Sequence, residues 1–118
     1  MTEPALTEQV VLALAGPGMG RGDDRLGMAL LANFVRLLGE REPLPVVAIV
    51  CYNEGVRHLL AESPLLGHLQ ALEKRGVPVI ACRTCVEYFG LEDGLHAGRP
   101  GTMLEIQGLL LSHRTVAL

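Results

Sequence analysis

Three unbroken runs of mostly apolar residues, at 9–15, 44–51 and 77–82, constrain the fold of this chain most strongly. A strand with one exposed face alternates apolar and polar residues, whereas a continuous short run is typical of a strand buried on both faces. The runs are far shorter than the roughly 20 residues that a membrane-spanning helix needs. They therefore predict a mainly parallel sheet inside the domain, with helices covering both of its faces.

The segments between these runs carry helical periodicity. Apolar residues recur at helical spacing from Leu26 to Leu38, with Asp23 or Asp24 as the N-cap and Gly39 at the position where the helix ends. Shorter helices are predicted at 54–61, from a Ser63 cap to residue 76, at 84–89 and at 103–111, before a last strand at 115–118. This alternation predicts one domain over residues 1–118, a three-layer α/β/α fold with about five strands.

Composition and charge exclude several classes of function. The chain has two Phe, two Tyr and no Trp, so its core is aliphatic, and its net charge of -3 offers no basic surface for nucleic acid or an anionic membrane. Residues 1–4 are acidic and lack the basic start of a signal peptide. Three cysteines, an odd number, favour reduced thiols over a disulfide framework. We therefore expect a cytoplasmic protein.

The carboxyl ends of the predicted strands are where a parallel sheet binds its ligands. The first of the segments there, the glycine loop at 16–24, fits neither nucleotide-binding fingerprint, and Asp23 and Asp24 would repel a phosphate. We interpret it as a tight turn that needs positive φ, with Arg21 as an anion contact. No bound cofactor is predicted.

The segment after the third run, Cys82-Arg83-Thr84-Cys85, is a C-x-x-C at the junction of a strand and a helix. The helix dipole lowers the pKa of a thiol placed there, and Arg83 adds to this effect if it points inward. Such a thiol suits dithiol redox exchange, metal binding or carrying sulfur as a persulfide. A metal needs two further ligands that the scattered histidines do not supply, and we expect His58 and His68 to be solvated, so no metal site is predicted.

Further candidate residues lie near these segments, and two of them, Asn53 and Tyr88, have two possible roles each. Asn53 either offers a hydrogen bond at the site or serves turn chemistry alone, and Gly55 supplies the unusual backbone angle. Tyr88 either lines the cleft beside Cys82 or packs one face of its ring. Cys51 is interpreted as a small core residue.

Taken together in this order, four segments resemble the DsrE-like sulfurtransferase family, and within it the C-terminal domain of the YedF-like selenium-metabolism proteins. The resemblance rests on residues 20–27, 52–56, 69–77 and 82–90. It implies a DsrE-type fold and a sulfur-relay function, in which a strand-end cysteine accepts sulfane sulfur and passes it to a partner's thiol. It assigns the carrier role to Cys82 and matches Cys85 to the second cysteine of the YedF-like pattern.

The resemblance also implies partners. Related proteins form oligomers, so we expect a homo-oligomer, and because no C-P-x-P motif is present, a separate TusA-like carrier would serve as donor or acceptor. Arg83 stands where a glycine is usual, which alters access to Cys82 or strengthens its thiolate. Persulfide exchange needs an accessible thiolate at residue 82. Two alternatives stay open: a non-catalytic oligomeric binding module, and a dithiol redox protein that uses Cys82 and Cys85.

Overall fold

The protein, examined as a computed structural model that describes residues 8–118, contains a five-stranded sheet in which every neighbouring pair is parallel. The strand order is β4-β3-β2-β1-β5. The strands are β1 (Val10–Leu14), β2 (Val46–Cys51), β3 (Val79–Cys82), β4 (Arg99–Gly101) and β5 (Arg114–Ala117). The predicted three-layer α/β fold is confirmed, and β4 is the strand that the sequence pattern did not predict.

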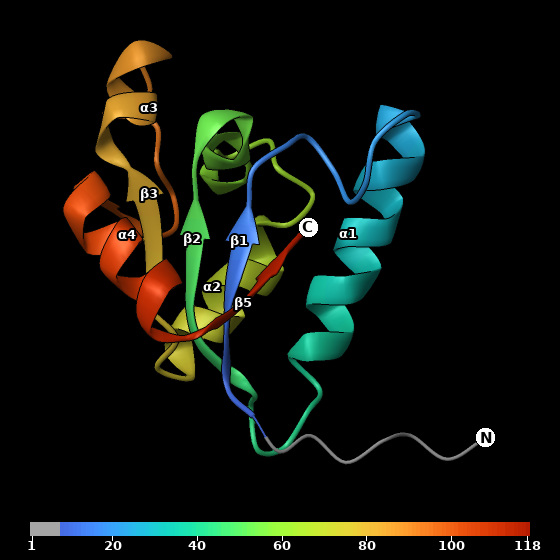
Figure 1. Cartoon of the computed structure of the whole chain (residues 1–118). Helices are drawn as coiled ribbons and strands as arrows, with labels where there is room; N and C mark the ends of the chain where they lie inside the picture. The colour runs from blue at the N-terminus through green and yellow to red at the C-terminus, as the bar shows by residue number, and fades with distance from the viewer. Residues whose placement is uncertain (1–7) are drawn as a thin grey trace.

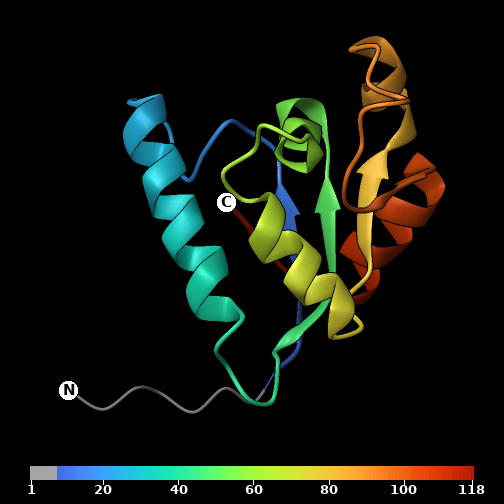
Figure 2. The same cartoon turned by 180° about the vertical axis from the view of Figure 1, so that it is seen from behind.

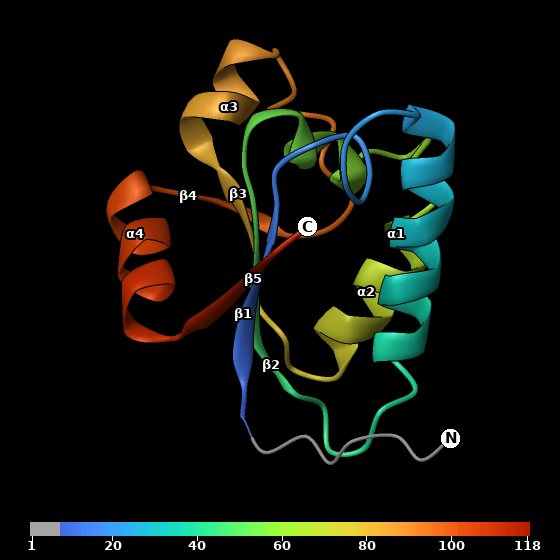
Figure 3. The ribbon, with the colours of Figure 1, turned by 45° about the vertical axis from the view of Figure 1, so that its right-hand side comes forward.

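Helices cover both faces of this sheet. They are α1 (Asp24–Leu38), α2 (Leu66–Lys74), α3 (Arg83–Tyr88) and α4 (Met103–Ser112), together with a 3-10 helix, η1 (Asn53–Leu59). Helices α1 and α2 pack on one face and α4 on the other (Figure 3). The short elements η1 and α3 lie beyond the carboxyl ends of β2 and β3 (Figure 1). None of the helices in residues 8–118 has the length and apolar character needed to cross a bilayer.

Alternation along the strands divides the core into two halves. Leu12 and Leu14 of β1 point toward the α1 and α2 side, whereas Val11 and Ala13 point toward Ile106 of α4. These four side chains are all buried, which is why residues 11–14 include no polar residue.

Helix starts differ in how they are capped. Asp23 is the N-cap of α1, and its Oδ1 accepts a hydrogen bond from the Leu26 amide at 2.8 Å. The predicted Ser63 cap of α2 is wrong, because its hydroxyl accepts from the Leu65 amide while the helix starts later, at Leu66, without a side-chain cap. Gly39 ends α1 as predicted, although its backbone is right-handed.

Loss of the Asp23 cap gives a first prediction. Asp23→Ala leaves the Leu26 amide without its acceptor, so the free energy of unfolding is expected to fall by about 1 kcal/mol in urea denaturation. Asp24→Ala is the control, since Asp24 lies inside the first turn and makes no such bond. An equal loss in both variants would show that charge near the helix start, and not capping, stabilises α1.

Candidate functional site

Three connecting segments meet at the carboxyl edge of the sheet: the glycine loop, η1 and α3. Gly20 and Gly22 have φ of 78° and 121°, which confirms a turn that requires positive φ. The loop and α3 lie on opposite sides of η1 in both views (Figures 1 and 2). Arg21 is an exposed residue of this loop, which η1 separates from α3 (Figures 1 and 2).

The turn after β2 brings η1 against the end of β1. The left-handed residue of this turn is Asn53, with φ of 53°, and not Gly55 as the sequence suggested. Gly55 is required for a different reason, because a Cβ there would lie 1.9 Å from the carbonyl oxygen of Leu14. The Tyr52 amide donates to that same oxygen at 3.1 Å. These contacts fix the first residues of η1 relative to the sheet.

Cys82 and Cys85 form the centre of the site. Cys82 ends β3 and is the N-cap residue of α3, so Cys85 follows one helical turn later. The Cys85 side chain packs against the buried cluster that contains Cys82, so the two thiols are neighbours. The backbone N–H of Asn53 donates to Cys85 Sγ at 3.1 Å and links the turn after β2 to α3. The structure thus joins Asn53, Cys82 and Cys85, with Asn53 contributing its main chain.

The two thiols differ in exposure. Cys82 is only 2% exposed, among Val11, Ile80 and Ile106, whereas Cys85 is half-buried. The expectation of an accessible thiol at residue 82 is therefore wrong for the isolated chain, because a side chain on that face of β3 points into the core beneath α4. Burial raises the pKa of the Cys85 thiol, the Asn53 N–H lowers it, and the neighbouring Cys82 raises it further.

The remaining predicted site residues lie on the outside of α3. Arg83 is exposed, and Tyr88 is 83% exposed with its ring edge-on to Phe89 at 5.3 Å between centroids. Tyr88 therefore forms a T-shaped pair with Phe89 and is otherwise mostly exposed, while Arg83 places an exposed charge one residue after the buried thiol.

Two residues near the site carried no usable sequence signal. His58, expected to be solvated, is only 2% exposed, and its Nε2–H donates to the Gly16 carbonyl at 2.8 Å. Burial lowers its pKa, so the imidazole is neutral at pH 7. The Arg57 guanidinium lies over the Phe89 ring, 4.4 Å from its centroid, and so connects η1 to α3. Both contacts join segments that are distant in sequence.

Cys51 is a core residue, as interpreted from the sequence: it is fully buried, and this burial raises its pKa from 9.0 to about 12. The unfolded chain releases this proton near pH 9, so between pH 9 and 12 the folded state binds more protons. The free energy of unfolding is expected to fall by about 1.4 kcal/mol per pH unit in that window from this group alone.

Denaturant titrations of the wild type and Cys51→Ala across this pH range measure the effect, because other groups titrate in both proteins. The variant should lose stability with pH less steeply by that amount. If the free energy of unfolding falls with pH equally steeply in both proteins, folding does not raise the pKa of the Cys51 thiol.

The protein is thus an all-parallel α/β domain with two neighbouring thiols at the carboxyl edge of its sheet. The chain is a member of the DsrE/DsrF-like family, whose sequence model matches residues 9–114. Among residues 8–118, no cluster of three or more His, Cys, Asp or Glu side chains is arranged to hold a metal ion.

Solved structures share the fold. The ychN protein of E. coli superposes with a TM-score of 0.70 at 21% identity, over 95% of this chain and 100% of that one. MTH1491 from Methanobacterium thermoautotrophicum gives 0.66 at 21% identity, with the same shares covered. BT1422 from Bacteroides thetaiotaomicron gives 0.62 at 13% identity, over 92% and 94% of the two chains. A search of curated proteins found no match.

Proposed function

We propose that the chain carries sulfane sulfur in a sulfur relay, receiving it at Cys85 and holding it at Cys82. Membership of the DsrE/DsrF-like family supports a sulfur-relay function. The observation that carries the proposal is the contact between two thiols of unequal exposure at the carboxyl edge of the sheet. A donor reaches the outer thiol, and the inner one keeps the transferred sulfur away from water and competing thiols.

Each step of this transfer is an exchange between sulfur atoms. The Cys85 thiolate attacks the outer sulfur of a donor persulfide, whose S–S bond breaks, and the donor leaves as a thiolate that takes a proton from water. The Cys82 thiolate then attacks the outer sulfur of the Cys85 persulfide, which transfers that sulfur and releases the Cys85 thiolate. The acceptor's thiol reverses the sequence, so no external oxidant or reductant is consumed.

One local contact favours the thiolate that the first step needs. Burial and the neighbouring Cys82 raise the pKa of Cys85, whereas the hydrogen bond from the Asn53 N–H lowers it and stabilises the thiolate when it forms. Arg83, two residues before Cys85 in the chain, adds an exposed positive charge. A separate TusA-like carrier remains the proposed donor or acceptor, and selenium of a YedF-like pathway remains a proposed alternative cargo.

The contact between the thiols also favours a second candidate, dithiol redox exchange. If the Cys82 thiolate attacks the inner sulfur of the Cys85 persulfide, a Cys82–Cys85 disulfide forms and hydrosulfide leaves. The disulfide then needs an external reductant before the site can work again. The two candidates therefore leave different products on the protein.

Intact mass measurement after exposure to glutathione persulfide tests both. The relay predicts a stable product heavier by one sulfur atom, which a thiol acceptor removes. A product lighter by two hydrogens, with hydrosulfide released, supports the redox protein instead. An unchanged mass, with none of the thiols alkylated by iodoacetamide in the native protein, supports a non-catalytic binding module and overturns the proposal.

A further inference from the structure

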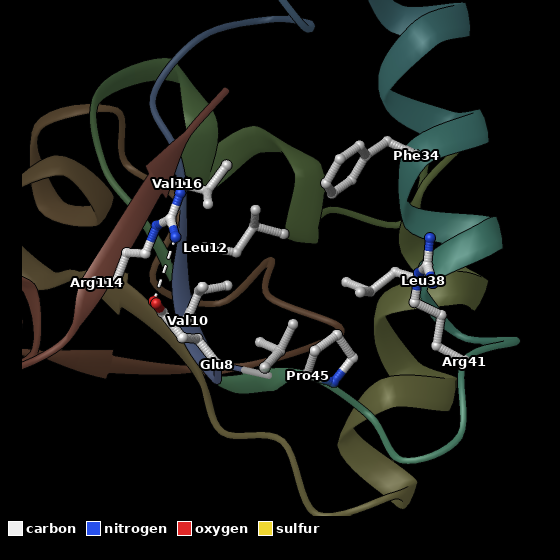
Figure 4. A pocket seen from close by; sticks show the side chains of 10 residues that line it. Glu8, Val10, Leu12, Phe34, Leu38, Arg41, Pro45, Arg114 and Val116 are labelled. Atoms are coloured by element: carbon white, nitrogen blue, oxygen red, sulfur yellow. Dashed lines mark hydrogen bonds and ion pairs between the residues drawn. The ribbon is translucent and has the colours of Figure 1, made fainter. Parts of the chain in front are cut away.

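A cavity of about 390 Å³ lies between α1 and the part of the sheet formed by β1 and β5 (Figure 4). Its walls come from the first residues of β1 and β2, the second half of α1, and β5. The lining side chains used below are Leu12, Phe34, Leu38, Arg41, Arg114 and Val116. None of the cavity's lining residues belongs to the cysteine site, so the cavity is separate from that site.

Apolar side chains form the opposing walls. Leu12 and Val116 are paired neighbours on β1 and β5, and they face Phe34 and Leu38 of α1 across the gap (Figure 4). The volume lies within the range of small-molecule sites. It corresponds to roughly a dozen groups the size of a water molecule, enough for a single short hydrocarbon chain and too little for a two-chain lipid.

Charged groups lie beside these apolar walls. Among the described residues, the charged ones that line the cavity are Arg41, Arg114 and Glu8. Arg114 pairs with Glu8 at 3.3 Å, and both side chains are more than half exposed. An exposed ion pair of this kind contributes little stability, so an incoming carboxylate can replace Glu8 at Arg114 at small cost. The guanidinium fork suits a carboxylate in particular.

From this arrangement we infer that the cavity binds a free medium-chain carboxylic acid, with its hydrocarbon tail between the sheet and α1 and its carboxylate at Arg114. The hydrocarbon tail itself leaves water and fills the space between the two walls, which supplies most of the affinity. Arg114 fixes the orientation of the acid and selects it over an uncharged molecule of the same length. This inference does not depend on the sulfur chemistry of the cysteines.

Isothermal titration calorimetry of the full chain with decanoate tests the inference, with decanol as the uncharged comparison. We expect one decanoate per chain and a several-fold weaker affinity for decanol. Arg114→Ala should weaken decanoate binding by about fivefold and bring its affinity to that of decanol. Val116→Trp should abolish binding of both, because the indole fills the space between the walls.

Matched controls separate these effects from general damage. Arg25→Ala removes an exposed positive charge outside the cavity, and Ala117→Trp places an indole at the next position of β5, on the opposite face of the strand. Both should bind decanoate like the wild type. Absence of binding to the wild type, unchanged binding in Val116→Trp, or equal affinities for decanoate and decanol in the wild type would overturn the assignment.

Discussion

Replacement of Cys85 by serine is expected to slow the loading of sulfur onto Cys82 by about tenfold or more. In the proposed relay, Cys85 passes sulfur directly to the neighbouring Cys82 thiol. Without it, a donor reaches Cys82 only when α3 opens locally, and an opening that costs more than about 1.4 kcal/mol reduces the rate at least tenfold. Time-resolved intact mass and peptide mapping after quenching with iodoacetamide measure the rate and the site of loading.

Two further variants complete this test. Cys82→Ser should load at Cys85 at the wild-type rate but lose its sulfur faster to an added thiol. The reason is that Cys85 is more exposed than Cys82, so an added thiol reaches sulfur bound there more easily. Cys51→Ser is the control, since that thiol is fully buried and its pKa is about 12. If Cys85→Ser loads Cys82 as fast as the wild type, the proposed order of transfer is wrong. Loading of Cys51 in place of Cys82 and Cys85 would exclude these two residues as the sulfur carriers.

The Gly55→Ala variant is expected to lose about 3 kcal/mol or more of its free energy of unfolding. An alanine Cβ there would lie 1.9 Å from the Leu14 oxygen and 2.6 Å from the Leu14 carbon, both of them main-chain atoms of a central strand. Backbone at the end of β1 cannot move aside without disturbing the hydrogen bond from Tyr52 to the same oxygen. Forced overpacking of this kind belongs to the largest effects of single substitutions.

Gly67→Ala is the matched control, because Gly67 lies within α2 and an added Cβ would meet nothing within 4 Å. It should stabilise the protein by up to about 1 kcal/mol through helix propensity. If Gly55→Ala folds, alkylation of Cys85 should change as well, since displacement of η1 moves the Asn53 N–H from the sulfur. Equal stability of the two variants would show that η1 moves freely relative to β1.

The strands buried on both faces could be predicted because burial leaves a visible mark in the sequence. Each of β1, β2 and β3 coincides with a continuous apolar run. Strand β4 could not be predicted, because Arg99-Pro100-Gly101 has neither alternation nor an apolar run and pairs with β3 through its main chain. Its position is determined by the neighbouring strand and by the start of α4.

The candidate site was only partly predictable, for a related reason. A C-x-x-C after a buried strand locates Cys82 and Cys85 at the carboxyl edge. The sequence does not show which side chains at the end of β3 face α4, so the burial of Cys82 against Ile106 could not be predicted. The Asn53 N–H is a main-chain group that any residue could supply, and the His58 hydrogen bond depends on a partner 42 positions away.

The pairing of β5 with β1 has a consequence for how the protein is made. Val10 pairs with Arg114, so one edge of the first strand stays open until almost all of the described chain has left the ribosome. Contacts this distant in sequence slow folding, and an open strand edge is a template for association with other chains. Nascent chains that stall before β5 emerges should therefore depend on chaperones, whereas completed chains should not.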